Sequence, residues 1–167
     1  IGGGRAMGCL EYFLDVIDAE FFGKSWNGPS LMATLDRLEA AEAADDATWE
    51  GYSAWSIALH CAKCKRVVAV DLGVRAPDWD YGEETWFPAP ADPSPSAWER
   101  DRALLRVMHD LAMGALRALP EERLAEAMPS WKRPWGDVIA WLATHDAFHG
   151  AQIRSMGLTA FKEKRHE

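Results

Sequence analysis

Two histidines stand four residues apart near the end of the chain, in the stretch ATHDAFHGAQI. Because residues i and i+4 of an α-helix lie on one face, His145 and His149 are expected to point in the same direction. Two imidazoles with this spacing can bind a single divalent metal ion. The spacing alone is a weak indication, since a buried histidine is more often hydrogen-bonded than bound to a metal.

A third histidine, His60, lies in an earlier apolar segment and strengthens the metal interpretation. The predicted inward face of this segment comprises Ser53, Ile57, His60, Cys64, Val67 and Asp71. The predicted inward face of the last helix comprises Trp135, Val138, Leu142, His145, His149, Gln152 and Met156. If the two helices are antiparallel, a rise of about 1.5 Å per residue places all three histidines roughly 10–15 Å from the same end.

Three imidazoles at one level of a core need a physical reason. Each buried polar group without a partner costs about 1–3 kcal/mol. A divalent metal ion removes this penalty by using the nitrogen lone pairs, and three such ligands leave one position open for water or substrate. Core histidines that are only hydrogen-bonded remain the alternative.

Five helical segments with apolar periodicity are expected to position these residues. They cover residues 10–22, a short helix from residue 30, and residues 53–73, 96–119 and 134–157. Ser53 is a predicted N-cap, Ser96 and Glu99 form a predicted capping box, and Pro134 is expected in the first turn of the last helix. No segment has a convincing strand pattern.

This pattern predicts an all-α fold with one domain over residues 1–167, in which residues 1–9 are a flexible N-terminus or a cloning remnant. The long connection between residues 73 and 96 can cross the length of a bundle, so the helices that flank it can run parallel. We therefore expect a four-helix bundle of up-down-down-up order. Its core is expected to include Leu10, Phe13, Ile17, Leu104, Leu111, Val138 and Leu142.

The composition is that of a globular protein, with 49% hydrophobic residues and a formal net charge of −8. The negative charge argues against the basic surface that nucleic-acid binding requires. No apolar run is long enough for a membrane span, and no secretory signal is recognisable. Three cysteines are too few, and odd in number, for a disulfide framework, so the cytoplasm is the expected location. Cys61 and Cys64 have redox-motif spacing, but their helical context disfavours that role.

Several stretches resemble the DinB/YfiT-like family of metalloenzymes. HDAFHGAQI is similar to the signature of the family's last helix, and in YSAWSIALHCAKCKRVV a serine and a tryptophan precede the histidine by seven and five residues, as in the family. SWNGPSL and DWDY are further similarities, and the resemblance extends from residue 10 to residue 158. It implies an up-down-down-up four-helix bundle in which His60, His145 and His149 bind a metal ion.

The resemblance also implies a chemistry. Family members include bacillithiol S-transferases and a mycothiol-dependent maleylpyruvate isomerase, so we expect metal-dependent thiol S-transfer with zinc or nickel as the ion. The metal would hold a low-molecular-weight thiol as thiolate for attack on an electrophile, or else activate water for hydrolysis. Asp146 and Gln152 are candidates to support the ligands. Trp79, Trp86 and Trp131 are expected to shape the electrophile pocket.

Cys64 departs from the family, where an aromatic residue often stands one turn after the histidine of the second helix. It is either a further thiolate ligand or a small buried hydrophobe, which is the commoner role of such a cysteine. Cys61 lies off the ligand face and is expected to pack in the core. His109 is expected at the boundary of the core and His166 in a polar tail.

Two functional alternatives to thiol transfer stay open. One is a non-catalytic metal-binding bundle with a structural or stress-related role. The other is a helical interaction domain whose histidines are only hydrogen-bonded. The tryptophans in loops and the apolar helix at residues 31–38 also suggest a homodimer.

Overall fold

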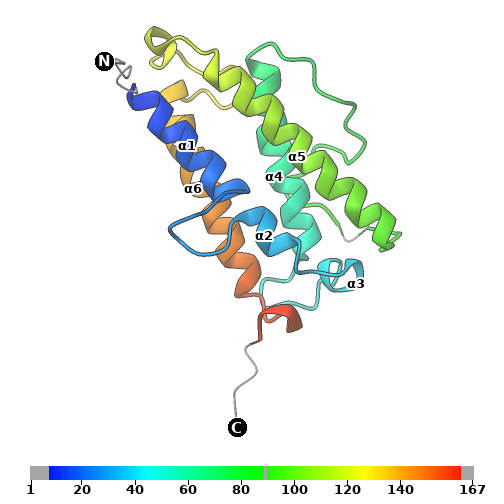
Figure 1. Cartoon of the computed structure of the whole chain (residues 1–167). Helices are drawn as coiled ribbons and strands as arrows, with labels where there is room; N and C mark the ends of the chain where they lie inside the picture. The colour runs from blue at the N-terminus through cyan, green and yellow to red at the C-terminus, as the bar shows by residue number, and fades with distance from the viewer. Residues whose placement is uncertain (1–7, 89, 163–167) are drawn as a thin grey trace.

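Four long helices lie against one another in the computed structural model, which describes residues 8–88 and 90–162 (Figure 1). They are α1 (Cys9–Phe21), α4 (Ala54–Asp71), α5 (Pro95–Arg117) and α6 (Trp135–Arg154). The connections contain the short helices α2 (Leu31–Leu35) and α3 (Ala40–Ala43) and the 3-10 turn η1 (Glu121–Arg123), and a second 3-10 turn, η2 (Thr159–Phe161), follows α6. No strand occurs in the described residues, so the all-α prediction is confirmed.

The helix starts follow local capping chemistry. The Ser53 hydroxyl accepts a hydrogen bond from the Ser56 amide at 3.0 Å, as predicted for the N-cap of α4. The predicted capping box at the start of α5 is wrong, because Ser94 is the N-cap and accepts from the Ala97 amide. Pro95 explains the earlier start, since proline has a fixed φ and no amide hydrogen to satisfy in a first turn.

The two outer boundaries also differ from the prediction. Helix α6 has Pro134 as its N-cap and ends at Arg154, three residues before the predicted stop at Gly157. Gly157 has a φ of +87°, and a side chain there would meet the Trp49 ring. Residue 9 begins α1 and so is not part of an N-terminal extension. Residues 1–7 and His166 lie outside the described residues.

The core lies between two helix pairs, with α4 packed on α5 and α1 packed on α6. Of the predicted core, Ile17, Val138 and Leu142 are buried, and Leu10, Leu104 and Leu111 are half-buried against it. Phe13 is a correction, because its side chain is 42% exposed. Helix α1 buries the face of Leu14, Ile17 and Phe21 and turns Phe13 to solvent.

Hydrogen bonds between the helix ends give the directions of three long helices. Tyr52, before α4, contacts Gln152 near the end of α6, and Asp71, at the end of α4, accepts from Ser130 before α6. Helices α4 and α6 are therefore antiparallel. Near the starts of α4 and α5, the indole of Trp55 donates to Asp101, so these two helices run in the same direction.

The long connection from α4 to α5 turns back along α4 (Figure 1). The Phe87 amide donates to the Ser56 hydroxyl at 3.0 Å, and the Lys63 ammonium donates to the Glu84 carbonyl at 3.0 Å. These bonds hold the connection alongside α4 between Ser56 and Lys63. Within the part of the chain that the structure describes, no helix is long and apolar enough to cross a membrane.

Candidate metal centre

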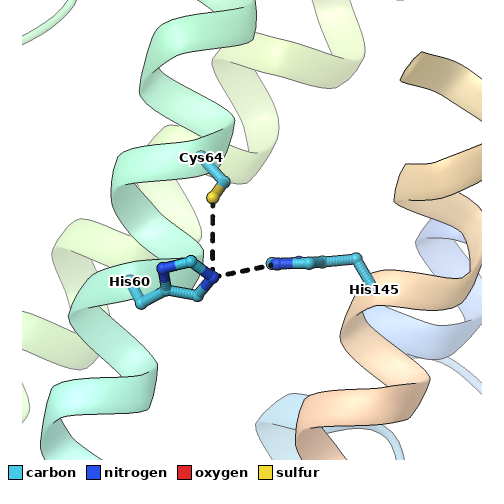
Figure 2. Close-up of side chains that lie close together, drawn as sticks. All are labelled: His60, Cys64 and His145. Atoms are coloured by element: carbon cyan, nitrogen blue, oxygen red, sulfur yellow. Dashed lines mark hydrogen bonds between the residues drawn. The ribbon is translucent and has the colours of Figure 1, made fainter. Parts of the chain in front are cut away.

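Helices α4 and α6 bring the Nε2 atoms of His60 and His145 opposite each other (Figure 2). Their Nε2 atoms are 3.2 Å apart. The Nδ1–H group of His60 donates to the Thr85 carbonyl of the long connection, at 3.1 Å. Since this bond places the hydrogen on Nδ1, Nε2 of His60 carries a free lone pair directed toward His145.

His149 lies one turn beyond His145, and the three imidazole rings form a group. The His149 ring centroid is 4.4 Å from that of His145 and 5.0 Å from that of His60. Nδ1–H of His149 donates to the Gln152 side-chain oxygen at 2.8 Å, and the Gln152 amide donates to the Tyr52 hydroxyl at 2.6 Å. Gln152 therefore fixes the His149 tautomer that leaves Nε2 free, the supporting position expected of it.

Asp146 lies beside His145 and pairs with a buried lysine. Its carboxylate accepts two hydrogen bonds from the Lys65 ammonium, at 2.9 and 2.7 Å, and both side chains are buried. Nδ1 of His145 lies 3.7 Å from this carboxylate, which is too long for a hydrogen bond, and it has no other partner among the described residues. Asp146 thus neutralises a buried lysine beside the histidines.

Burial keeps the imidazoles neutral. Removal from water, together with the neighbouring His149, lowers the pKa of His60 to about 4. Removal from water and the neighbouring His145 lower the pKa of His149 to about 4. Burial also lowers the pKa of His145, although Asp146 opposes this effect. All three rings are therefore neutral at neutral pH, with one nitrogen free of hydrogen, and this is the form that binds metal ions.

The separation of the facing nitrogens fits a divalent transition metal. Zinc–nitrogen bonds of about 2.0–2.1 Å put two ligand atoms of a tetrahedral site roughly 3.3 Å apart. The Nε2 atoms of His60 and His145 are 3.2 Å apart. The same separation fits a hydrogen bond in which Nε2–H of His145 donates to Nε2 of His60. If Nε2 of His145 carries no hydrogen, the two lone pairs repel each other, and a cation between them removes the repulsion. The geometry is therefore compatible with a metal ion as well as with this hydrogen bond.

Two cysteines approach the histidines. The ligand atoms of His60, Cys64 and His145 all lie within 4.8 Å of one another, and so do those of Cys61, His145 and His149. His145 belongs to both groups, and neither group contains all three histidines. Burial raises the pKa of Cys64 to about 12 and that of Cys61 well above its usual value, so without a metal ion both remain thiols.

A cavity of about 440 Å³ adjoins this site. Its walls are mostly apolar and aromatic, and Lys63 supplies the cationic side chain among its lining residues: His60, Lys63, Cys64, Val67, Thr85, Trp131 and Trp141. Because His60 and Cys64 belong to the lining, a small molecule in the cavity can reach the candidate ligands. This combination of a polar centre and apolar walls is typical of small-molecule sites.

The predicted tryptophans occupy three different positions. Trp131 lines the cavity, and Trp86 stacks on His60 with ring centroids 4.6 Å apart. Trp79 packs against Tyr81 and Phe87 in the core instead. Trp141 was missed by the sequence analysis, although it precedes His145 by one helical turn and its ring lies 4.3 Å from that imidazole.

His109 is not at the boundary of the core, as predicted, but buried within it. Its Nε2 atom lies 2.8 Å from the Asp18 carboxylate, and its ring stacks on Phe21 with centroids 3.7 Å apart. The carboxylate comes from α1, a contact that the pattern of α5 alone does not reveal. His109 therefore serves packing between α1 and α5, outside the group of His60, His145 and His149.

Comparison with known proteins gives one match. A family model described as the DinB superfamily matches residues 29–153, a range that includes His60, His145, His149, Cys64 and the whole of the long connection. Searches of curated proteins and of solved structures give no significant match. The family model covers well over half of the chain, and it agrees with the resemblance seen in the sequence. The chain belongs to the DinB superfamily.

Proposed function

We propose that this chain is a metal-dependent thiol S-transferase in which His60, His145 and His149 hold a divalent ion. The observation that carries the proposal is the pair of Nε2 atoms, 3.2 Å apart, beside a cavity of about 440 Å³. A structural metal site needs no access, whereas a catalytic site needs an open position that a substrate can reach.

The proposed architecture is a four-helix bundle of up-down-down-up order. The antiparallel arrangement of α4 and α6 and the shared direction of α4 and α5 support it. In such a bundle the start of α4 and the end of α6 lie at one end. His60 and the pair His145 and His149 then meet at one level, as the ring distances of 4.4–5.3 Å support.

A bound zinc or nickel ion would supply a Lewis acid that keeps a coordinated thiol as thiolate near neutral pH. The chain's own residues prepare the site. Thr85 and Gln152 fix the hydrogens of His60 and His149 on Nδ1, and Trp86 holds the His60 ring by stacking. Low-molecular-weight thiols are kept reduced in the cytoplasm, where we expect the protein to act.

The cavity walls suit a small electrophile better than a polymer. Val67, Trp131 and Trp141 offer apolar surface for its carbon skeleton and exclude water from the reacting atoms. Lys63 offers a positive charge for an anionic group on the electrophile or on the thiol.

A non-catalytic metal-binding bundle is the second candidate. It is favoured by Cys64, whose sulfur lies 3.7 Å from Nε2 of His60 and can add a fourth donor to the three histidines. If no incoming thiol displaced this sulfur, the closed coordination shell would stabilise the fold without turnover.

Reloading experiments test these functions. The protein is stripped with a chelator, reloaded with zinc or nickel, and assayed with glutathione, cysteine, bacillithiol and mycothiol against chlorodinitrobenzene. We expect about one ion per chain and transfer that depends on the metal, both lost in His60→Ala. If calorimetry shows that the protein binds neither zinc nor nickel, the proposal is wrong. If the protein binds an ion but transfers none of the four thiols, the non-catalytic bundle is favoured.

A further inference from the structure

We propose that Cys64 is a metal ligand of this chain and that its sulfur holds the coordination position which an incoming thiol takes over. The inference rests on the proposed function in one respect, namely that His60 and His145 bind a divalent ion. It adds a sulfur donor to an otherwise all-nitrogen site, and it names the resting ligand that the substrate displaces.

The distances around Nε2 of His60 fit one tetrahedral centre. Zinc–sulfur bonds of about 2.3 Å and zinc–nitrogen bonds of about 2.0–2.1 Å place a sulfur and a nitrogen ligand roughly 3.6 Å apart. The Cys64 sulfur is 3.7 Å from Nε2 of His60, and Nε2 of His145 is 3.2 Å from the same atom. The remaining edge, from Cys64 to His145, is no longer than 4.8 Å. Figure 2 shows the Cys64 sulfur and the His145 ring both directed toward Nε2 of His60.

The surroundings of Cys64 differ from those of a packing cysteine. Its side chain is buried, yet it belongs to neither of the two apolar clusters that form the core, whereas Cys61 belongs to one of them. Cys64 instead lines the cavity beside His60. A small hydrophobe would gain its stability from apolar neighbours, whereas the Cys64 sulfur lies 3.7 Å from an imidazole nitrogen and borders the cavity.

Helical geometry places Cys64 where a ligand is needed. His60 and Cys64 stand at i and i+4 of α4, and His145 and His149 stand at i and i+4 of α6. Each helix therefore directs a pair of donor side chains, one turn apart, toward the space between the antiparallel helices. Cys64 is therefore the second donor of the pair on α4, as His149 is on α6.

Ligand exchange follows from the position of the cavity. An incoming thiol in the cavity approaches the side of the site where the Cys64 sulfur lies. Its sulfur–hydrogen bond would break, its proton would pass to the Cys64 sulfur, and the substrate thiolate would replace Cys64 among the donors. One thiolate replaces another, so the net charge of the site does not change and no oxidant or reductant is required.

The alternative is a thiol that merely donates a weak hydrogen bond to Nε2 of His60, which the 3.7 Å distance also permits. Cobalt(II) separates the two cases, because a thiolate bound to tetrahedral cobalt gives a near-ultraviolet charge-transfer band and imidazole ligands alone do not. Chelated wild type, Cys64→Ser and Cys61→Ser are titrated with cobalt alone, because Cys61 is the other cysteine whose sulfur lies within 4.8 Å of a His145 nitrogen. Zinc-edge X-ray absorption on zinc-loaded wild type counts sulfur neighbours without any substitution.

We expect the band in wild type and Cys61→Ser, and one sulfur neighbour at zinc. Cys64→Ser should bind cobalt without the band and at least roughly 10–100-fold more weakly, the range seen even for supporting residues. Addition of glutathione to cobalt-loaded Cys64→Ser should restore the band. Cobalt bound to wild type without a band, or zinc without a sulfur neighbour, would overturn the role of Cys64 and leave the proposed function intact. Failure of wild type to bind either ion would overturn both.

Discussion

The buried ion pair between Lys65 and Asp146 should control stability more than any surface charge does. The two side chains are 2% and 0% exposed, and they share two hydrogen bonds of 2.7–2.9 Å. Removal of one partner from such a pair leaves an unpaired buried charge and costs about 3–5 kcal/mol. For a chain of this size, each 1 kcal/mol lowers the melting temperature by roughly 2–4 °C. Lys65→Met should therefore melt about 6–20 °C below wild type.

The measurement is thermal denaturation followed by helical circular dichroism, with a chelator present so that metal binding does not contribute. Arg123→Met is the matched control, because Arg123 pairs with Glu126 at the surface, where a salt bridge contributes at most about 1 kcal/mol. The double variant Lys65→Met/Asp146→Leu replaces both charges with apolar groups. It should recover most of the loss, since buried pairs can be exchanged for hydrophobic residues at little cost.

The stability loss of Lys65→Met should depend on pH through the ionisation of Asp146. Burial raises the pKa of Asp146, but Lys65 and His145 lower it by more, to about 2. In the wild type this stabilisation is present above the unfolded pKa near 3.8 and is lost as the pH falls toward 2. Without Lys65, burial dominates and the pKa rises, so protonation of Asp146 should relieve the deficit of Lys65→Met as the pH falls from 7 toward 4. A variant that melts like the control, or a deficit independent of pH, would refute the reasoning.

Three further predictions follow from the same structure. His60→Ala should abolish metal binding but lower the stability of the chelated protein by only about 1–2 kcal/mol, because the core lies elsewhere; loss of the helical circular-dichroism signal at room temperature would contradict this. Burial lowers the pKa of His109 and His149 to about 4, so between pH 6.5 and 4 these histidines bind protons in the unfolded state but not in the folded state. The free energy of unfolding of the chelated protein should therefore fall between pH 6.5 and 4, by up to about 1.4 kcal/mol per pH unit for each histidine. Urea denaturation measures this, and a free energy of unfolding that does not change over this range would contradict the prediction. Leu31, Leu35 and Leu38 are buried and so offer no surface for the predicted homodimer, which exposed Tyr12 on α1 and Phe22 just after it favour instead. Sedimentation at micromolar concentration should give twice 18.6 kDa, and a species of 18.6 kDa alone would count against the dimer.

Helix positions could be predicted from the sequence where a local signal is unambiguous. Ser53 precedes an apolar run without a competitor, and it is the observed N-cap. At α5 two serines compete, and the capping-box pattern of Ser96 and Glu99 favoured the wrong one. Pro95 was the better guide, because its ring is compatible with a first turn and makes Ser94 the cap. The periodicity also identified the apolar face of α1. It wrongly included Phe13, which lies at the edge of that face, where contacts with the other helices decide whether a side chain is buried.

Part of the candidate site could also be predicted from the sequence, and part could not. The convergence of His60, His145 and His149 follows from helical spacing and depth, and the rings do lie together. The partner of His60 does not follow, because it is the backbone carbonyl of Thr85 in an aperiodic connection. Any residue can supply a carbonyl, so no side-chain pattern marks it. Gln152 could be found only because it continues the face that holds His149.

The position of Asp146 could have been inferred from the same helical geometry that pairs the histidines. Successive residues of an α-helix are rotated by about 100°, so Asp146 cannot share the face of His145. The same rotation on α4 carries Lys65 away from Cys64, and the two charged side chains meet inside the bundle beside the histidines. Their opposite charges cancel, so the ion pair adds no net charge next to the ligands. The charge of a metal ion would then be balanced by the donors themselves, and among the proposed ligands only Cys64, as a thiolate, supplies a negative one.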